Sequence, residues 1–336
     1  MRKLLIITLF IFIGTTALYI LLFNSQLLAR DNQPSSYKIG ILAASDSRLV
    51  KVDGLVDGLK EYGFTEDDYE LHIKNAFNNT DNIPTLAQEL VDLDVDIIVT
   101  TGTYETSTAK QVTSDTNIPV VFIGVGCALE MGFVEDNIVT GCNITGVDSQ
   151  YVQLSGKRLE YLQRLAPNTE TVLVLYNPLS TPFGPSSQYL YEAADKLNIQ
   201  LEIAPVTEKS EMLKVLNDKQ DDIDAIMLLC SLLFDEATET IVDFSLSNQI
   251  PVMGTNDQQV KQGILATYGI TRYQEGIQAS RIVANILNGQ DPELIPIESP
   301  VILEFHVNKE SAEILNLDLE LAKIPDVSNY VNSISR

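Results

Sequence analysis

Short apolar runs alternate with amphipathic segments along most of the chain. Runs rich in Val, Ile and Leu lie at residues 37–43, 97–101, 120–124, 171–176, 223–229 and 266–269. Between them lie segments with helical spacing, such as Val52, Leu55, Val56 and Leu59. Buried strands that alternate with helices are typical of parallel sheets joined by right-handed crossovers. The pattern therefore predicts an α/β protein.

Two stretches of the chain repeat one order of polar and apolar positions. Residues 95–124 and 223–256 each carry an Asp, an apolar run, a polar stretch, a helical segment, then Ile-Pro-Val and another apolar run. At 336 residues the chain also exceeds the usual length of one domain. We therefore expect two Rossmann-like lobes with parallel sheets, joined by a hinge and separated by a cleft.

The expected lobes are discontinuous in sequence. Lobe 1 is expected to comprise residues 38–147 and about 272–292, and lobe 2 residues 148–271 and about 298–325. Residues 141–147 are predicted to be a turn-rich passage before a new helix. Residues 301–306 are predicted to form a late strand, remote in sequence from both sheets.

The N-terminus carries a long apolar segment. Residues 4–23 contain no charge and follow Arg2 and Lys3. About 20 apolar residues span a bilayer as a helix, whereas the apolar region of a signal peptide has about 7–15. The length favours an uncleaved membrane anchor over a removed signal peptide within residues 1–29, and both remain open. Residues 30–37 are then expected to be a linker, and the positive-inside rule places all that follows outside the cytoplasm.

The chain is strongly acidic, with 22 Lys and Arg against 46 Asp and Glu and a net charge of −24. Such a surface repels phosphate backbones, and no basic stripe relieves the repulsion, so we expect no nucleic-acid partner.

Ligands of open α/β sheets bind beyond the carboxyl ends of the strands. This rule selects the candidate ligand-binding residues Ser45, Asp46, Thr101, Gly102, Thr103, Gly124, Tyr176, Asn177, Ser231, Asp257 and Tyr268. Thr101 and Thr103 stand at a predicted helix N-terminus, where they could hold a ligand carboxylate or cap the helix. Asp257 could pair with a ligand ammonium or cap its own helix. Tyr176 and Tyr268 could stack on a planar ligand or belong to the core.

The three cysteines leave two interpretations open. Cys127 and Cys142 are close in sequence and could form a disulfide in an oxidising compartment. Alternatively, Cys127, Cys142 and Cys230 are small buried hydrophobic residues.

Enzyme signatures are sparse. Neither His72 nor His306 has metal-ligand spacing with another His or with Cys, and no Gly-x-Ser-x-Gly elbow or phosphate-binding loop is found. A secreted hydrolase that uses His306 or Cys230 lacks a base and a nucleophile at matching strand ends. We therefore predict a protein that is not an enzyme and holds no metal or cofactor.

Several segments together resemble one family. The matching segments are residues 38–64, 98–110, 118–125, 143–147, 172–178, 250–270 and 273–292. In order and spacing they resemble the substrate-binding proteins of ABC transporters with a type I periplasmic-binding fold, in the branch linked to aromatic amino acid uptake. The resemblance implies two lobes that close on a small ligand, an ABC permease as membrane partner, and action as a monomer. It also implies that the Thr-Gly-Thr segment holds a ligand carboxylate, with Asn177 and Asp257 contributing from the other lobe.

The chain departs from this family's pattern at two places in the expected cleft. Gly126-Cys127 stands where relatives commonly carry Asp-Pro after the strand. Residues 179–187 follow Asn177-Pro178 where a Glu and Asn-Ser are usual. The lipid-anchoring Cys common in such proteins is also missing. The expected function is capture of a small solute, such as an aromatic or branched amino acid, for an importer. The alternative is an extracytoplasmic module that senses the ligand and signals to a membrane partner.

Overall fold

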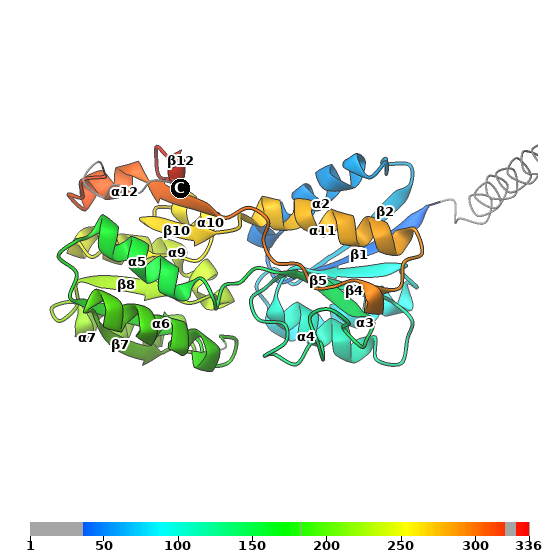
Figure 1. Cartoon of the computed structure of the whole chain (residues 1–336), viewed down its shortest axis with the longest axis horizontal. Helices are drawn as coiled ribbons and strands as arrows, with labels where there is room; N and C mark the ends of the chain where they lie inside the picture. The colour runs from blue at the N-terminus through cyan, green and yellow to red at the C-terminus, as the bar shows by residue number, and fades with distance from the viewer. Residues whose placement is uncertain (1–35, 182, 320–326, 336) are drawn as a thin grey trace, which may run out of the picture.

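The computed structural model describes residues 36–181, 183–319 and 327–335. These residues form two α/β lobes that lie side by side, each built around one mainly parallel sheet (Figure 1). The predicted fold class is confirmed. Among the described residues no helix is long and apolar enough to cross a membrane. The predicted N-terminal anchor or signal peptide, and the linker up to residue 35, lie outside this part of the chain.

The sheet of lobe 1 has five parallel strands in the order β2-β1-β3-β4-β5. Its strands are β1 (Tyr37–Ala43), β2 (Tyr69–Asn75), β3 (Ile97–Thr100), β4 (Val120–Val125) and β5 (Ile144–Asp148). Its helices are η1 (Asp46–Arg48), α2 (Val50–Glu61), η2 (Thr80–Asn82), α3 (Ile83–Asp92) and α4 (Thr103–Val112). Successive side chains of β1 enter different core clusters on the two faces: Ile39 and Ile41 one, Leu42 the other. Burial on both faces explains the continuous apolar runs.

The sheet of lobe 2 has the strand order β12-β11-β10-β9-β8-β6-β7, in which only β10 and β11 pair antiparallel. Its strands are β6 (Thr171–Tyr176), β7 (Gln200–Pro205), β8 (Ala225–Leu228), β9 (Val252–Met253), β10 (Ala266–Gly269), β11 (Glu304–Asn308) and β12 (Val327–Val331). Its helices are α5 (Ser155–Leu165), α6 (Phe183–Leu197), α7 (Lys209–Lys219), α8 (Leu232–Glu236), α9 (Thr238–Asn248), α10 (Asp257–Lys261) and α12 (Lys309–Ile314). The late strand predicted at residues 301–306 is thus β11, which joins the second sheet beside β10.

One helix returns to lobe 1 after the second sheet is almost complete. Helix α11 (Arg272–Leu287) lies against α2, as the orange and blue helices show in Figure 1. Glycines permit this close contact: a Cβ on Gly276 would lie 1.9 Å from the backbone oxygen of Lys51, and one on Gly54 2.0 Å from that of Tyr273. The chain then passes through η3 (Pro292–Leu294) and along the edge of β5 before it enters β11. The lobes are therefore linked after β5, after β10 and before β11.

The passage predicted to be turn-rich, residues 141–147, is only partly so. Residues Ile144–Asp148 form β5, and all but the last of them are buried. A Cβ at Gly146 would lie 2.3 Å from the backbone oxygen of Phe122 on β4, so the glycine serves close strand packing rather than a turn. The assignment of this glycine to a turn from the sequence is wrong.

Candidate functional site

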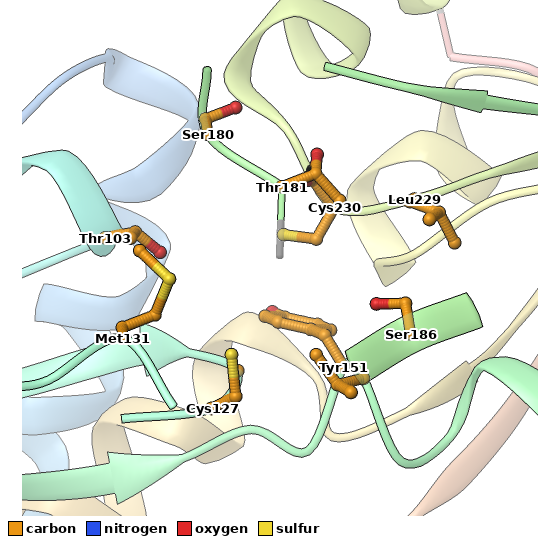
Figure 2. A pocket seen from close by; sticks show the side chains of 11 residues that line it. Thr103, Cys127, Met131, Tyr151, Ser180, Thr181, Ser186, Leu229 and Cys230 are labelled. Carbon is orange, nitrogen blue, oxygen red and sulfur yellow. Dashed lines mark hydrogen bonds between the residues drawn. The ribbon is translucent and has the colours of Figure 1, made fainter. Parts of the chain in front are cut away.

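A small cavity lies at the junction of the two lobes. It is lined from lobe 1 by Thr103, Gly126, Cys127 and Met131, from the link after β5 by Tyr151 and Val152, and from lobe 2 by Ser180, Thr181, Ser186, Leu229 and Cys230 (Figure 2). The space open to the centre of a water-sized sphere is about 20 Å³, little more than a single water needs. A larger occupant therefore enters only if the lobes part or the lining side chains move.

The strand-end rule explains most of this lining. Thr103 opens α4 directly after β3, and Cys127 follows β4. In lobe 2, Thr181 lies in the loop after β6, and Cys230 follows β8. The carboxyl ends of strands in both lobes thus face one another across the cavity. Both segments that depart from the family pattern contribute to its wall.

Of the predicted ligand-binding residues, only Thr103 lines this cavity. Ser45 and Asp46, placed after β1, have other partners: the Ser45 hydroxyl lies 3.1 Å from that of Ser47, and Asp46 accepts a hydrogen bond of 2.6 Å from Asn75. They shape the loop that leads into η1.

Thr101 and Gly102 surround a buried ion pair instead. Arg48 and Glu105 approach to 2.8 Å, and the Thr101 hydroxyl donates to Glu105 at 3.0 Å. A Cβ on Gly102 would lie 1.9 Å from an Arg48 nitrogen, so the glycine leaves room for the guanidinium. Burial alone would raise the pKa of Glu105, but the charge of Arg48 and hydrogen bonds to the carboxylate hold that pKa below its ordinary value.

Gly124 makes room for a second buried cation. It has a φ of +81°, and a Cβ there would lie 1.8 Å from the Lys51 ammonium nitrogen. Lys51 pairs with Glu275 at 2.9 Å and donates to the backbone oxygen of Thr101 at 3.0 Å. Burial lowers the pKa of Lys51, although the charge of Glu275 opposes this shift. The ammonium thus fixes the carboxyl end of β3, from which Thr103 reaches the cavity.

Asp257 is occupied by protein groups. Its carboxylate pairs with Lys261 at 2.9 Å and accepts the backbone N–H of Arg272 at 3.1 Å. Burial raises its pKa, but the Lys261 and Arg272 contacts outweigh burial and the pKa lies below its ordinary value. The helix cap is its neighbour Asn256, which accepts from the backbone N–H of Gln259.

The remaining predicted residues of lobe 2 hold loops or fill the core. Asn177 accepts the backbone N–H of Leu179 at 2.9 Å, and Ser231 caps α8. Both belong to loops of which another residue, Thr181 or Cys230, lines the cavity. Tyr176 and Tyr268 pack on the lobe 2 core, where Tyr176 stacks on Phe183 and Tyr268 meets Tyr161 edge-on.

A further ion pair joins the lobes. Arg272, at the start of α11, donates to Asp235 of α8 at 2.6 Å and to the backbone oxygen of Ser47 at 3.0 Å. Both charged side chains are less than one tenth exposed. One guanidinium therefore contacts both lobes beside the cavity.

Arg158 of α5 is a buried cation of a different kind. Its side chain donates to the backbone oxygens of Tyr268 and Tyr151, and its Nη2 has no hydrogen-bond partner. Within the described residues no carboxylate lies within ion-pair distance of it. Burial lowers the pKa of Arg158 to about 10. Its guanidinium carbon lies 5.5 Å from the ring centre of Tyr151, which lines the cavity.

All three cysteines are free thiols, so the disulfide left open between Cys127 and Cys142 is not formed here. The Cys142 sulfur instead donates to the backbone oxygens of Phe133 and Thr140, whereas Cys127 and Cys230 line the cavity from opposite lobes (Figure 2). Burial and nearby carboxylates raise the pKa of Cys127 to about 12 and that of Cys230 to about 11. Both therefore act as neutral, polarisable wall groups at neutral pH.

Sequence reasoning did not assign a ligand role to most of the lining. Cys127 and Cys230 were considered only for other chemistry, and Ser180 and Thr181 lie in a segment noted only as a departure from the family. No feature of the sequence indicated that Tyr151 would line a ligand site. It lies at the link after β5 and donates to Glu275 at 2.8 Å, so only the folded chain brings it to the cavity.

Comparisons with known proteins agree with this geometry. The chain is 23% identical over 265 residues to a tyrosine-binding protein of Clostridioides difficile (strain R20291), covering 79% of this chain and 76% of the relative. A solved ABC domain from Streptococcus pneumonia in complex with L-Trp has a TM-score of 0.81 at 21% identity, covering 88% of this chain and all of that one. The ligand-free, open structure of a substrate binding protein with adhesive properties from Clostridium difficile has a TM-score of 0.68 at 23% identity, covering 88% and 99%.

These solved structures show the fold, a type I periplasmic-binding fold with two lobes. The family model for ABC transporter substrate binding proteins matches residues 38–323, nearly the whole described chain. The chain belongs to the family of ABC transporter substrate-binding proteins.

Proposed function

We propose that this protein is the extracytoplasmic solute-binding component of an ABC-type importer. It captures a small solute with an aromatic or branched apolar side chain in the interlobe cavity and delivers it to a membrane permease. The observation that carries the proposal is the cavity itself, since both lobes contribute its wall at their strand ends. The protein is held at the membrane by its apolar N-terminal segment, or is released after cleavage.

The wall chemistry supports a ligand of this kind. The ring of Tyr151, the side chains of Val152 and Leu229 and three sulfur-containing residues offer apolar contact. Hydroxyls of Thr103, Ser180, Thr181 and Ser186 offer hydrogen bonds, and the N-terminus of α4 favours a carboxylate. The relatives named for tyrosine binding or solved with L-Trp support the same size of ligand, and amino acids with such side chains are the first candidates.

Capture works through closure of the lobes. A ligand shifts the equilibrium toward the closed form only by as much as it binds that form better. Because lining groups from both lobes surround the cavity, the full set of contacts exists only when the lobes meet. The links after β5, after β10 and before β11 serve as the hinge.

Thermal-shift screening of the full-length chain in detergent tests this function. A ligand at 100 times its dissociation constant adds about 2.7 kcal/mol to the free energy of unfolding. We expect stabilisation by aromatic or branched amino acids or their close analogues, and none by nucleosides or sugars. Stabilisation by sugars alone would contradict the proposed ligand class.

Removal of a single hydroxyl group tests whether the ligand binds in this cavity. Thr103→Val keeps the side-chain shape and should weaken ligand binding by about tenfold, the loss expected for one hydrogen bond. Thr108→Val, on the same helix but outside the cavity, is the matched control and should leave the affinity unchanged. Equal affinities in both variants would show that the ligand lies elsewhere.

A ligand-sensing module that signals to a membrane partner is the second candidate. The same closure would serve it, so the fold does not separate the two functions. Uptake of labelled ligand by cells with and without the gene distinguishes them: loss of uptake supports the importer, and normal uptake supports sensing.

A further inference from the structure

No charged side chain is found among the described residues that line the cavity. The described lining residues carry hydroxyls, sulfur atoms, one phenol ring and aliphatic groups. A buried ammonium group is costly unless carboxylates or several acceptor oxygens surround it. A free amino acid would bring such an ammonium into this space. The wall offers it no acidic partner.

Four buried carboxylates close to the cavity are already paired. Each contacts a cation of the protein: Glu105 with Arg48 at 2.8 Å, Glu275 with Lys51 at 2.9 Å, Asp235 with Arg272 at 2.6 Å and Asp257 with Lys261 at 2.9 Å. A fifth, Asp148, accepts the backbone N–H groups of Ala128 and Gln150 at 3.0 and 2.8 Å and is not part of the wall. The four ion-paired carboxylates are thus engaged by protein cations. Asp148 and the exposed Glu130, whose charges act on the Cys127 thiol, have no cation partner among the described residues but do not line the cavity.

Beside the cavity, Arg158 is a buried positive charge without an anionic partner among the described residues. Arg158 is 1% exposed, has an unpartnered Nη2 and has no carboxylate within ion-pair distance in the described chain. It lies against Tyr151, and its charge also acts on the thiol of Cys230. Both of those residues line the cavity (Figure 2). An uncompensated buried cation favours an anion nearby.

The opposite side of the cavity is formed in part by the N-terminus of helix α4. Thr103 is the first residue of the ten-residue helix α4, and the N-cap Gly102 supplies no side chain to satisfy the first N–H groups. The buried carboxylate of Glu105, in the first turn, accepts its own backbone N–H, so it offsets part of the positive end of that helix. Arg158 acts from lobe 2. A ligand ammonium would find no carboxylate in the described wall, whereas a ligand carboxylate would be attracted by the buried charge of Arg158.

We infer that the preferred ligand carries a carboxylate and an aromatic or branched side chain but no ammonium group, as the 2-oxo acid counterparts of amino acids do. This inference rests on the proposed function and narrows its ligand class. The protein would then select against the amino acid by leaving its ammonium without a partner.

Matched ligand pairs test the inference without any mutation. Calorimetric titration of the full-length chain compares phenylpyruvate with phenylalanine, and 4-methyl-2-oxopentanoate with leucine. We expect the 2-oxo acid of at least one pair to bind ten times or more tighter than its amino acid, and phenethylamine not to bind. An amino acid that binds as tightly as its 2-oxo acid, or tighter, overturns the inference but leaves the proposed function intact. If no member of either pair binds, the proposed ligand class fails, and the inference fails with it.

A variant links the preference to Arg158. Arg158→Gln keeps a donor for the neighbouring backbone oxygens and removes the charge. It should lower the ratio of 2-oxo acid to amino acid affinity by about tenfold. Arg164→Gln is the matched control, since Arg164 lies on the same helix and pairs at the surface with Glu160. The control should leave the ratio unchanged. An unchanged ratio in a folded Arg158→Gln protein would contradict this role.

Discussion

Individual buried charges hold the strand ends in place beside the cavity. Arg48 and Lys51 lie under the loop that begins α4, each paired with a carboxylate and each accommodated by a glycine. Buried pairs contribute little net stability compared with apolar residues, but removal of one partner is costly. They fix the geometry of the loop more than they stabilise the fold, and they make that geometry sensitive to protonation.

Substitution of Glu105 should expose this sensitivity to pH. The folded-state pKa of Glu105 lies below its ordinary value of about 4.5, so the unfolded chain binds more protons as the pH falls through this range. Its stabilising contribution is therefore complete above about pH 4.5 and is lost as the pH falls through the lowered folded-state pKa. Glu105→Gln should remove this part of the acid dependence. At neutral pH it should cost about 3 kcal/mol, because Arg48 remains buried without a partner.

Urea denaturation of the wild type and the variant between about pH 3 and pH 7 measures both effects. Glu89→Gln is the control, because the Lys74–Glu89 pair is partly exposed to solvent, and pairs at the surface contribute roughly 0–1 kcal/mol. Parallel stability curves for wild type and Glu105→Gln would show that Glu105 does not titrate as argued.

At the scale of elements, the sequence predicted strands, helices and strand-end loops better than side-chain directions. Thr101 and Thr103 belong to one loop and have the same chemistry, yet Thr101 turns to Glu105 and Thr103 to the cavity. Residue type and position along the chain do not tell which of the two threonines faces the cavity. The difference arises in the fold, where Arg48 packs against Gly102 and pairs with Glu105 beside Thr101. Tyr151 reaches the cavity only because distant segments meet. The pattern of buried positions within one strand or helix can be predicted from its local sequence. The wall of a pocket cannot, because it depends on contacts between elements that are distant in sequence.

Contact between α2 and α11 is the element-level feature most open to test. Gly276→Ala would place a Cβ 1.9 Å from the backbone oxygen of Lys51, which cannot move without shifting α2. We expect a loss of about 1–3 kcal/mol in the free energy of unfolding, or more if the helices separate. Gly184→Ala, in helix α6 with no atom within 4 Å of the new Cβ, is the control and should be neutral or slightly stabilising. Equal melting temperatures for the two variants would contradict the close-packing argument.

At the scale of the whole molecule, the balance between open and closed lobes sets how much ligand affinity is observed. The ion pair between Arg272 and Asp235 joins α11, which packs on lobe 1, to α8 of lobe 2. It requires no ligand, so it favours closure in the empty protein. Observed affinity falls in proportion to the fraction of molecules in the binding-competent form.

Asp235→Asn should therefore shift the empty protein toward the open form. The amide keeps an oxygen for Asn256 and Gln259, which donate to Asp235. Its NH2 group takes the place of the oxygen that accepts from Arg272, so both the charge and that hydrogen bond are lost. Small-angle scattering should show a larger radius of gyration for the empty variant, and saturating ligand should restore the closed value. The ligand dissociation constant should rise about tenfold, equivalent to about 1.4 kcal/mol, and the dissociation rate should rise with it. An unchanged radius together with a weakened affinity would mean that Asp235 acts on the ligand directly. Unchanged values of both would mean that contacts other than this ion pair determine closure of the lobes.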